Sequence, residues 1–281
     1  PNADAPGDAS LVNSNRSADF NRAAYTRWLE CVRDVCSRRQ IVLIFDEVFT
    51  GFRLGYRGAQ GYFGIQADMV TYGKTLGGGF PVGVLCGRRE LMQRFKPEQP
   101  AHISFARGTF NSHPYVLAAM DVFLRRIEQP QYQTLYAQAE ALWDARIARL
   151  NARLQEEKLP VKVANLHTIC TVLYLTPSRY NWMFQFYLRD QGLELSWVGS
   201  GRMIMSLNFT DAEFEDVTER FLRAARQMSG DDWWWQSAEL TATSIKRQLM
   251  AEMLHARFPL LSKVQPRLQD IQPRNTGEVA P

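Results

Sequence analysis

The sequence predicts an α/β protein with a mostly parallel sheet, and three neighbouring features support this prediction. Ile41–Phe45 is an unbroken apolar run rich in β-branched residues, which is typical of a strand buried on both faces of a parallel sheet. An amphipathic helical pattern over Phe20–Arg39 precedes this run, and a second apolar run, Met69–Tyr72, follows it. A helix, a short turn and a buried strand form the second half of a βαβ unit.

Charged residues stand directly after both predicted strands. Asp46 and Glu47 end the first strand, and Lys74 follows the second and precedes Gly77–Gly79. Open α/β sheets bind ligands at the carboxyl ends of their strands. A lysine amine can form a Schiff base with pyridoxal phosphate, and a carboxylate beside the pyridine nitrogen keeps that ring an electron sink. The residue types and their positions therefore favour Lys74 and Asp46 as a pair for this cofactor.

The same stretch resembles a known family. The runs IFDEVFTGFR (44–53), GAQGYFG (58–64) and ADMVTYGKTLGGGFPVG (67–83) resemble the core of class III pyridoxal-phosphate aminotransferases. The likeness is to the glutamate-1-semialdehyde aminomutase branch, which includes aminotransferase domains of polyketide and peptide assembly lines. GTFNSHP (108–114) is similar to a further family motif, and the resemblance runs from about Phe20 to about Gln227.

The resemblance implies a fold-type I transferase. We expect a large domain with a mostly parallel sheet, incomplete at its N-terminus, and a small C-terminal α/β domain. The family's phosphate-binding loop and ring-stacking aromatic residue precede the segment that begins here, so the chain resembles the C-terminal part of a longer protein. The expected divisions are a lead-in loop (1–19), the large-domain part (20–129), the small domain (130–230) and a helical extension with a tail (231–281).

The resemblance also implies roles for individual residues. Lys74 is the catalytic lysine and Asp46 the partner of the ring nitrogen, while Val48 packs on the pyridine ring or is a plain core valine. Thr109 binds the cofactor phosphate in the neighbouring subunit's site, which implies a homodimer. Arg202 is a candidate for the substrate carboxylate, although Met205-Ser206 stands where such enzymes have paired prolines. A surface arginine at a strand end is the alternative for Arg202.

Periodicity and turn residues indicate the other elements. The antiparallel strand that the resemblance implies is Pro81–Gly87. His113, before Pro114, is expected to cap or pack a helix. Three adjacent tryptophans, Trp233–Trp235, cannot all face one core, so we expect some to meet another domain or a partner. Further helices are expected at 90–95, 115–126, 131–157, 182–189, 211–228 and 231–258, and strands at 103–105, 161–163, 169–175 and 203–207.

Composition excludes several classes of protein. The net charge of +4 is small and the basic residues are scattered, so nucleic acid is not an expected partner. No apolar run approaches the roughly 20 residues of a membrane span. The four cysteines form no CxxC pair, which predicts no metal site and fits a reducing cytoplasm.

The sequence therefore predicts a cytoplasmic aminotransferase that uses pyridoxal 5′-phosphate to move an amino group between an amino acid or amine and a keto acid, ketone or aldehyde. A glutamate-1-semialdehyde-type aminomutase would use the same groups on a single substrate. A nucleotide-binding protein is disfavoured, because the P-loop pattern requires glycine where Asp68 stands. A truncated, non-catalytic relative that acts as an interaction module is the remaining alternative.

Overall fold

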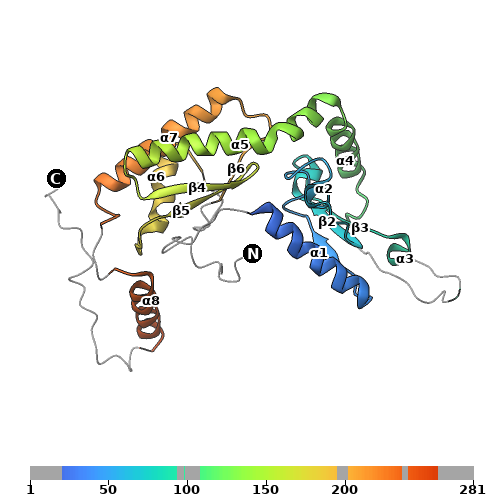
Figure 1. Ribbon diagram of the computed structural model, residues 1–281, viewed down its shortest axis with the longest axis horizontal. Helices are drawn as coiled ribbons and strands as arrows, with labels where there is room; N and C mark the ends of the chain where they lie inside the picture. The colour runs from blue at the N-terminus through green and yellow to red at the C-terminus, as the bar shows by residue number, and fades with distance from the viewer. Residues whose placement is uncertain (1–20, 94–97, 99–107, 195–201, 236–239, 259–281) are drawn as a thin grey trace. The chain divides into compact units, whose positions relative to one another are not determined.

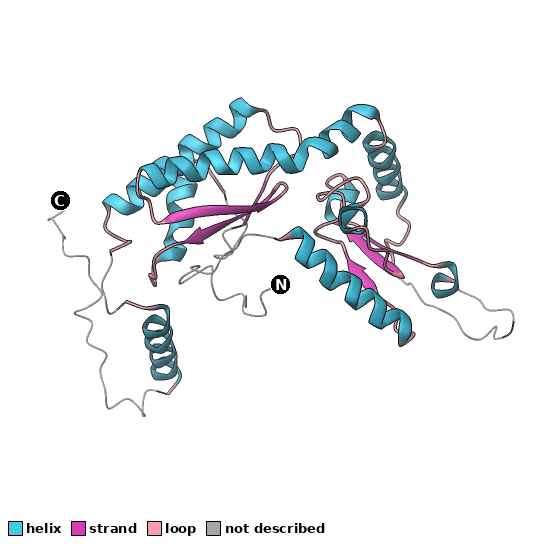
Figure 2. Ribbon diagram, viewed as in Figure 1, coloured by secondary structure: helices cyan, strands magenta, loops and turns pink. Residues whose placement is uncertain are grey.

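The computed structural model of this chain describes residues 21–93, 98, 108–194, 202–235 and 240–258. Contacts divide the chain into two compact units within one helix, between Trp143 and Asp144, and Leu166–Thr168 belongs to the first unit. Each unit has its own three-stranded sheet (Figure 1). Helices and strands occur in both units (Figure 2), so the α/β class is confirmed. The predicted domain boundaries before Pro130 and after Gly230 stay predictions.

Helix α1 (Arg22–Arg38) forms where the amphipathic pattern predicts it. Its first turn is capped by Asn21, whose side-chain oxygen accepts a 2.9 Å hydrogen bond from the backbone N–H of Ala24. Leu29 lies on its buried face. The helix ends before Gln40, which has a φ of 56°, and this left-handed residue turns the chain toward the sheet.

The sheet of the first unit consists of β1 (Ile44–Asp46), β2 (Met69–Gly73) and β3 (Gly83–Gly87) in that order. β1 pairs with β2 in parallel, and β3 pairs with β2 antiparallel. The antiparallel third strand confirms what the family resemblance implied. Asp68 joins the sheet to α1, because its buried carboxylate accepts hydrogen bonds from the Leu43 N–H (2.8 Å) and the Arg33 guanidinium (2.9 Å).

The expectation that Ile41–Phe45 is buried on both faces is wrong for this chain. The strand itself covers only Ile44–Asp46, and the side chains of Ile41 and Ile44 are 54% and 51% exposed. The physical reason is the position of β1, which is an edge strand of the sheet that the described residues form. An apolar run predicts burial only if its neighbours on both sides are present.

Short elements complete the first unit. The glycine- and aromatic-rich segment folds partly into α2 (Gly58–Phe63), whose Tyr62 and Phe63 are buried. The remaining elements are η1 (Lys74–Gly77), α3 (Arg89–Met92) and α4 (Pro114–Ile127). The strand predicted at 103–105 lies outside the described residues.

Helix α5 (Pro130–Glu156) begins at Pro130, which lies between the helices expected at 115–126 and 131–157. A proline at the first turn of a helix loses no hydrogen bond, since the first N–H groups have no partner within the helix. Four apolar side chains of this helix are buried, those of Trp143, Ile147, Leu150 and Leu154.

The second unit packs helices on the sheet β4 (Val161–Leu166), β5 (Ile169–Tyr174) and β6 (Arg202–Ile204). η2 (Asn181–Met183), α6 (Phe184–Asp190) and α7 (Asp211–Gly230) supply its helical part. Helix α7 begins with a capping box in which Thr210 and Glu213 satisfy each other's backbone N–H groups. Phe184, Phe221 and Leu222 have no exposed side chain and form the centre of this core.

The tryptophan cluster packs on its own unit. Trp234 is 6% exposed, its indole N–H donates to Oδ1 of Asn181 (3.0 Å), and its ring lies 5.3 Å from that of Phe184. The rings of Trp233 and Trp235 both lie beside Tyr180, at 4.9 and 5.5 Å. All three tryptophan rings thus contact residues of the second unit, and a contact of the cluster with another domain or a partner stays a prediction. Helix α8 (Ala242–Arg257) follows, and no helix within the described ranges is long and apolar enough to cross a membrane.

Candidate active site

The ends of β1 and β2 bring Asp46 and Lys74 to one edge of the sheet. The two strands are parallel, and Asp46 stands opposite Thr71 in their register. β2 ends at Gly73, so Lys74 is the first residue beyond it. Because parallel strands end at the same edge, both functional side chains leave the sheet on that side.

Asp46 is held as an ionised carboxylate. Its Oδ1 accepts hydrogen bonds from the backbone N–H of Val48 (3.0 Å) and the hydroxyl of Thr71 (2.9 Å). The Val48 N–H is the main cause of a pKa below the usual range for this carboxyl, followed by the Thr71 hydroxyl, with the positive charge of Lys74 adding to the effect. A carboxylate that stays negative is the partner that a protonated ring nitrogen requires.

Lys74 has an unusual backbone for a lysine. Its φ is 42°, in the left-handed region that favours glycine, and it opens the short helix η1. A non-glycine residue there costs on the order of 1–3 kcal/mol, and such strain gathers at functional sites. Its side chain is exposed, and its Nζ lies 5.7 Å from the centre of the Phe49 ring.

Val48 contacts the backbone next to Lys74. A Cβ on Gly73 would lie 3.1 Å from Cγ1 of Val48, so the valine packs directly against this glycine. Space is open beyond Lys74, because a Cβ on Gly78 or Gly79 would meet no heavy atom within 4 Å. The structure therefore brings Asp46, Val48 and Lys74 together.

Glu47 has a role that the sequence did not reveal. Its side chain is 1% exposed, and its carboxylate accepts hydrogen bonds from the N–H groups of Ala59 (2.5 Å) and Gln60 (3.2 Å) in the first turn of α2. Burial raises its pKa, and the two N–H groups oppose that rise. Gly58 has a φ of 62°, and a Cβ there would lie 2.2 Å from Oε2 of Glu47. Gly58, the first residue of α2, was the available signal for this contact.

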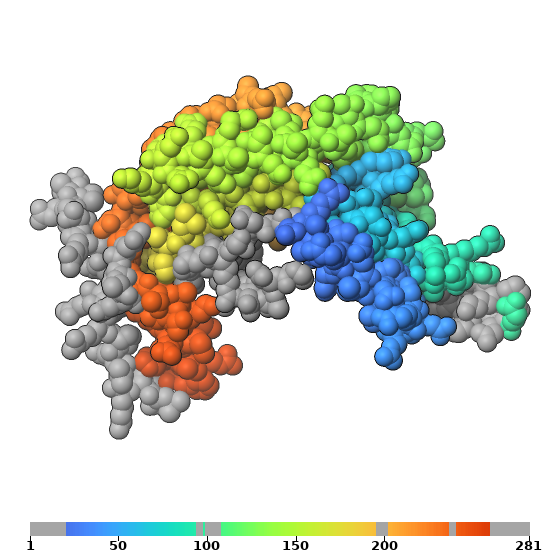
Figure 3. All heavy atoms as spheres, in the orientation of Figure 1, coloured from blue at the N-terminus to red at the C-terminus, as the bar shows by residue number. Residues whose placement is uncertain are grey.

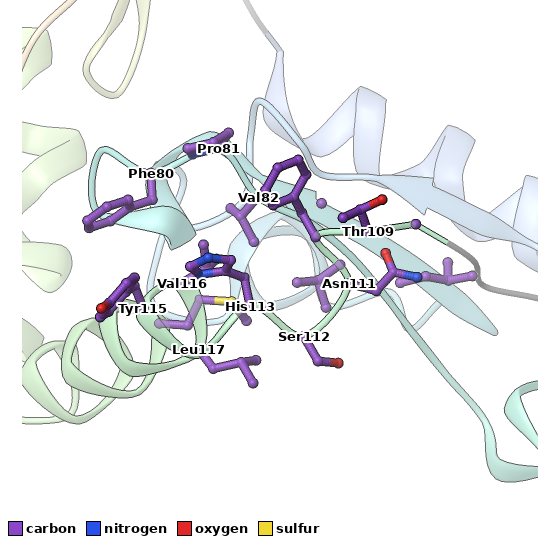
Figure 4. Close-up of a pocket in the computed structure, with 16 residues that line it drawn as sticks. Phe80, Pro81, Val82, Thr109, Asn111, Ser112, His113, Tyr115, Val116 and Leu117 are labelled. Atoms are coloured by element: carbon purple, nitrogen blue, oxygen red, sulfur yellow. The ribbon is translucent and has the colours of Figure 1, made fainter.

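Thr109 lines a cavity whose lining does not include Lys74. This open cavity of about 810 Å³ is lined by β3, the turn before it and the segment that leads into α4. Figure 4 shows Thr109 on the opposite side of this cavity from Phe80 and Tyr115. Asp46, Val48 and Lys74 are absent from its lining.

His113 packs rather than caps. It precedes Pro114 at the start of α4, and its side chain makes no capping hydrogen bond. Its ring lies 5.3 Å from that of Tyr115 and 6.1 Å from that of Phe110. Its buried Nδ1 has no hydrogen-bond partner within the part of the chain that the structure describes.

Arg202 belongs to the second unit. It begins β6 and stands opposite Thr171 of β5 in the register of that pair. Its side chain is exposed. The structure thus places Arg202 at a strand end, and a contact with a substrate carboxylate stays a prediction.

The residues at the sheet edge fit the cofactor that the resemblance implies. Asp46 supplies an ionised carboxylate, Val48 an apolar side chain and Lys74 an exposed amine, and the glycines beyond Lys74 leave room for a bulky planar group. Within the described ranges no group of His, Cys, Asp and Glu side chains could hold a metal ion.

Comparison with known proteins gives a family match over most of the chain. Residues 21–225 match the family model described as Aminotransferase class-III. The chain is 33% identical over 196 residues to the glutamate-1-semialdehyde 2,1-aminomutase of Methanococcus vannielii, covering 70% of this chain and 38% of that protein. It is 50% identical over 105 residues to the enzyme of the same name from Alkaliphilus oremlandii, covering 37% and 24% of the two chains.

Solved structures agree on the fold. An omega-transaminase from Sphaerobacter thermophilus superimposes with a TM-score of 0.63 at 24% identity, covering 73% of this chain and 48% of that one. A structure described as a transaminase with PLP bound gives a TM-score of 0.62 at 25% identity and the same coverages. The chain therefore spans about half the length of these two solved structures. Its matches span 38% and 24% of the lengths of the two curated relatives named above.

Proposed function

This chain belongs to the class III aminotransferase family, and from that premise we propose that it contributes Lys74, Asp46 and Val48 to a pyridoxal 5′-phosphate site for amino-group transfer. The proposed reaction moves an amino group between an amino acid or amine and a keto acid, ketone or aldehyde. The observation that carries the proposal is the meeting of Asp46 and Lys74 at adjoining ends of parallel β1 and β2. Since the chain spans 38% of the Methanococcus vannielii relative, the activity is proposed for the complete site to which these residues belong.

The chemistry divides between the cofactor and the chain. Pyridoxal phosphate, when bound, supplies an electron sink for the negative charge that forms on the substrate α-carbon. Asp46 would hold a proton on the ring nitrogen through its negative charge, and its lowered pKa favours that charged form. The amine of Lys74 would hold the aldehyde carbon of the cofactor. Once released by a substrate amine, the Lys74 amine would move a proton at the substrate α-carbon as general base and acid. Val48 would pack against one face of the ring.

A second copy of the chain would complete the site through Thr109. Thr109 is exposed, and the cavity that it lines does not include Lys74, which favours a role in another copy's site. Phe110 and Tyr115, which line the same cavity, are 78% and 73% exposed. Aromatic side chains exposed to this degree favour an interface between copies. We propose a homodimer in which the Thr109 hydroxyl and amide bind the cofactor phosphate of the partner.

An aminomutase is the second candidate, because the curated relatives named above are aminomutases. The two reactions differ in mass balance. An aminotransferase converts its amino donor to a carbonyl product before any acceptor is added, whereas an aminomutase rearranges one substrate without releasing such a product. Arg202 would hold a substrate carboxylate in either case. A cytoplasmic location is proposed from the cysteines, which are all free.

The first test is covalent trapping of the cofactor on the full 281-residue chain. Pyridoxal phosphate is added, the adduct is reduced with borohydride, and the modified lysines are identified by peptide mass spectrometry. We expect the label on Lys74 to exceed that on Lys162, a partly exposed lysine of β4, and to disappear in Lys74→Ala but not in Lys162→Ala. Equal labelling of the two lysines would contradict the proposal and favour the non-catalytic interaction module.

A further inference from the structure

The aromatic ring of Phe49 lies beside the amine of Lys74. The ring centre is 5.7 Å from Nζ of Lys74, within the roughly 6 Å over which an aromatic face attracts a cation. Phe49 is half-buried, whereas the side chain of Lys74 is exposed. Figure 3 shows that the blue-to-cyan part of the chain, which carries both segments, reaches the surface of the first unit. The proposed function assigns no role to this ring.

Hydrogen bonds fix the loop that carries Phe49. The Nε of Arg53 donates to the carbonyl of Phe49 (3.0 Å), and the Arg53 guanidinium carbon lies 5.4 Å from the centre of the same ring. The hydroxyl of Tyr136 in α5 donates to the carbonyl of Phe52 (2.9 Å), between these two residues of the loop. The position of the ring is therefore set by contacts that do not involve Lys74.

Asp46 also attracts the Lys74 amine, but it does so weakly. The charge of Lys74 contributes less to the lowered pKa of Asp46 than the Val48 N–H and the Thr71 hydroxyl do. Attraction between two charges does not depend on direction, whereas an aromatic ring attracts a cation toward its face. The ring of Phe49 is therefore the group that can set the direction in which the amine lies.

We propose that Phe49 is a positioning residue for Lys74, whose ring holds the ammonium form of the Lys74 amine at the edge of the sheet through a cation–π contact. The consequence for the reaction rests on the proposed function. As general base, Lys74 would take a proton from the substrate α-carbon, which keeps the electron pair, and would become an ammonium. A cation–π contact at an exposed position favours that charged form by a factor of roughly two to five. Phe49 would thus stabilise the protonated lysine and keep it in place to return the proton.

The test follows the side chain of Lys74 by NMR in the full 281-residue chain, with no cofactor added. The lysines are labelled with ¹³C at the ε-carbon, and the Lys74 signal is assigned from its loss in Lys74→Arg. An aromatic ring shifts protons that lie over its face upfield, so the ε-protons of Lys74 should lie upfield of those of Lys162. This upfield shift should be lost in Phe49→Leu, which removes the ring, and kept in Phe49→Tyr, which retains it.

A second measurement is competitive methylation of the lysines with formaldehyde and borohydride, again without cofactor. Only the uncharged amine reacts, and the ring favours the charged form. The ratio of methylation at Lys74 to that at Lys162 should therefore rise roughly two- to fivefold in Phe49→Leu. In Phe49→Tyr the ratio should stay at the value of the unaltered chain.

The matched control is Phe52→Leu, which removes a ring from the same loop. The Phe52 ring packs beside Tyr72 and Phe123, with 5.3 Å between ring centres in both pairs, so its loss should leave the Lys74 signal in place. Three results would overturn the proposal: no upfield shift in the unaltered chain, loss of the shift in Phe49→Tyr as well, or an unchanged methylation ratio in Phe49→Leu. An equal change in Phe52→Leu would overturn it too. Both measurements omit pyridoxal phosphate, so failure of cofactor trapping at Lys74 is a separate result.

Discussion

The hydroxyl of Thr71 on β2 donates a 2.9 Å hydrogen bond to Oδ1 of Asp46 on β1, across the parallel pair. This bond joins the two strands at the edge where Lys74 begins. It also lowers the pKa of Asp46, together with the Val48 N–H and the charge of Lys74.

Replacing Thr71 with valine should raise the pKa of Asp46 toward its ordinary value, since one of its hydrogen-bond donors is removed. The measurement is the titration of the Asp46 carboxyl carbon by NMR. In the control Thr134→Val, which removes a hydroxyl bonded to the Pro130 carbonyl in α5, the midpoint should not move. An unchanged midpoint in Thr71→Val would show that the hydroxyl does not stabilise the charged form.

Buried Glu47 should make stability depend on pH in a defined direction. Its folded-state pKa is raised above the ordinary value for a glutamate side chain, mainly by burial. A raised pKa means that its contribution is fully present below the unfolded pKa and is lost as pH rises through the folded pKa. Urea unfolding near pH 4 and pH 7 should show that the stability of the unaltered chain relative to Glu47→Gln falls as pH rises. A relative stability that rises over this range would contradict the assignment.

Two glycines separate the effect of backbone strain from that of a clash. Gly58 and Gly64 have φ values of 62° and 69°, but only at Gly58 would a Cβ meet Glu47, 2.2 Å from Oε2. Gly64→Ala should cost about 1–2 kcal/mol of unfolding free energy, the price of a left-handed alanine. Gly58→Ala should cost roughly 1–3 kcal/mol more, because the carboxylate must move. If denaturant unfolding shows that the two variants lose the same unfolding free energy, the Glu47 side chain moves aside without an energetic cost.

The middle tryptophan should dominate the stability of its cluster. Trp234→Ala removes a buried indole and should cost about 3–5 kcal/mol. Trp234→Phe keeps a ring against Phe184 but removes the N–H that donates to Asn181, at a cost of about 1–3 kcal/mol. Trp182→Ala, at a position 44% exposed, serves as the control and should cost less than either. Thermal unfolding of the three variants measures this order.

If Thr109 serves the partner's site, two defective variants should complement each other. Lys74→Ala retains Thr109, and Thr109→Ala retains Lys74, so a mixed dimer has one intact site. Trapping with pyridoxal phosphate and borohydride should therefore label Lys74 more strongly in the mixture than in Thr109→Ala alone. Mixing Thr109→Ala with the doubly substituted chain should restore nothing, and recovery there would assign the phosphate contact to another group.

The sequence predicted that Asp46 and Lys74 lie at the same edge of the sheet. Each follows an apolar run, and the end of such a run predicts the end of a strand. The same pattern failed on the burial of Ile44, since the apolar character of a strand does not state whether its neighbours belong to the same chain. The contact between Glu47 and the start of α2 was missed because its partners lie 12 and 13 residues away. Trp234 was missed for a similar reason: Asn181, its partner, is 53 residues distant.

The left-handed backbone of Lys74 has a consequence for directed evolution. Glycine adopts a φ of 42° without a steric penalty, so Lys74→Gly should relieve strain on the order of 1 kcal/mol or more in the isolated chain. A library selected for thermal robustness alone would drift toward losing this lysine while its folding improved. Any effort to stabilise this chain therefore has to screen for the reactive amine in parallel. Thermal stability favours glycine at position 74, whereas attachment of the cofactor requires lysine there.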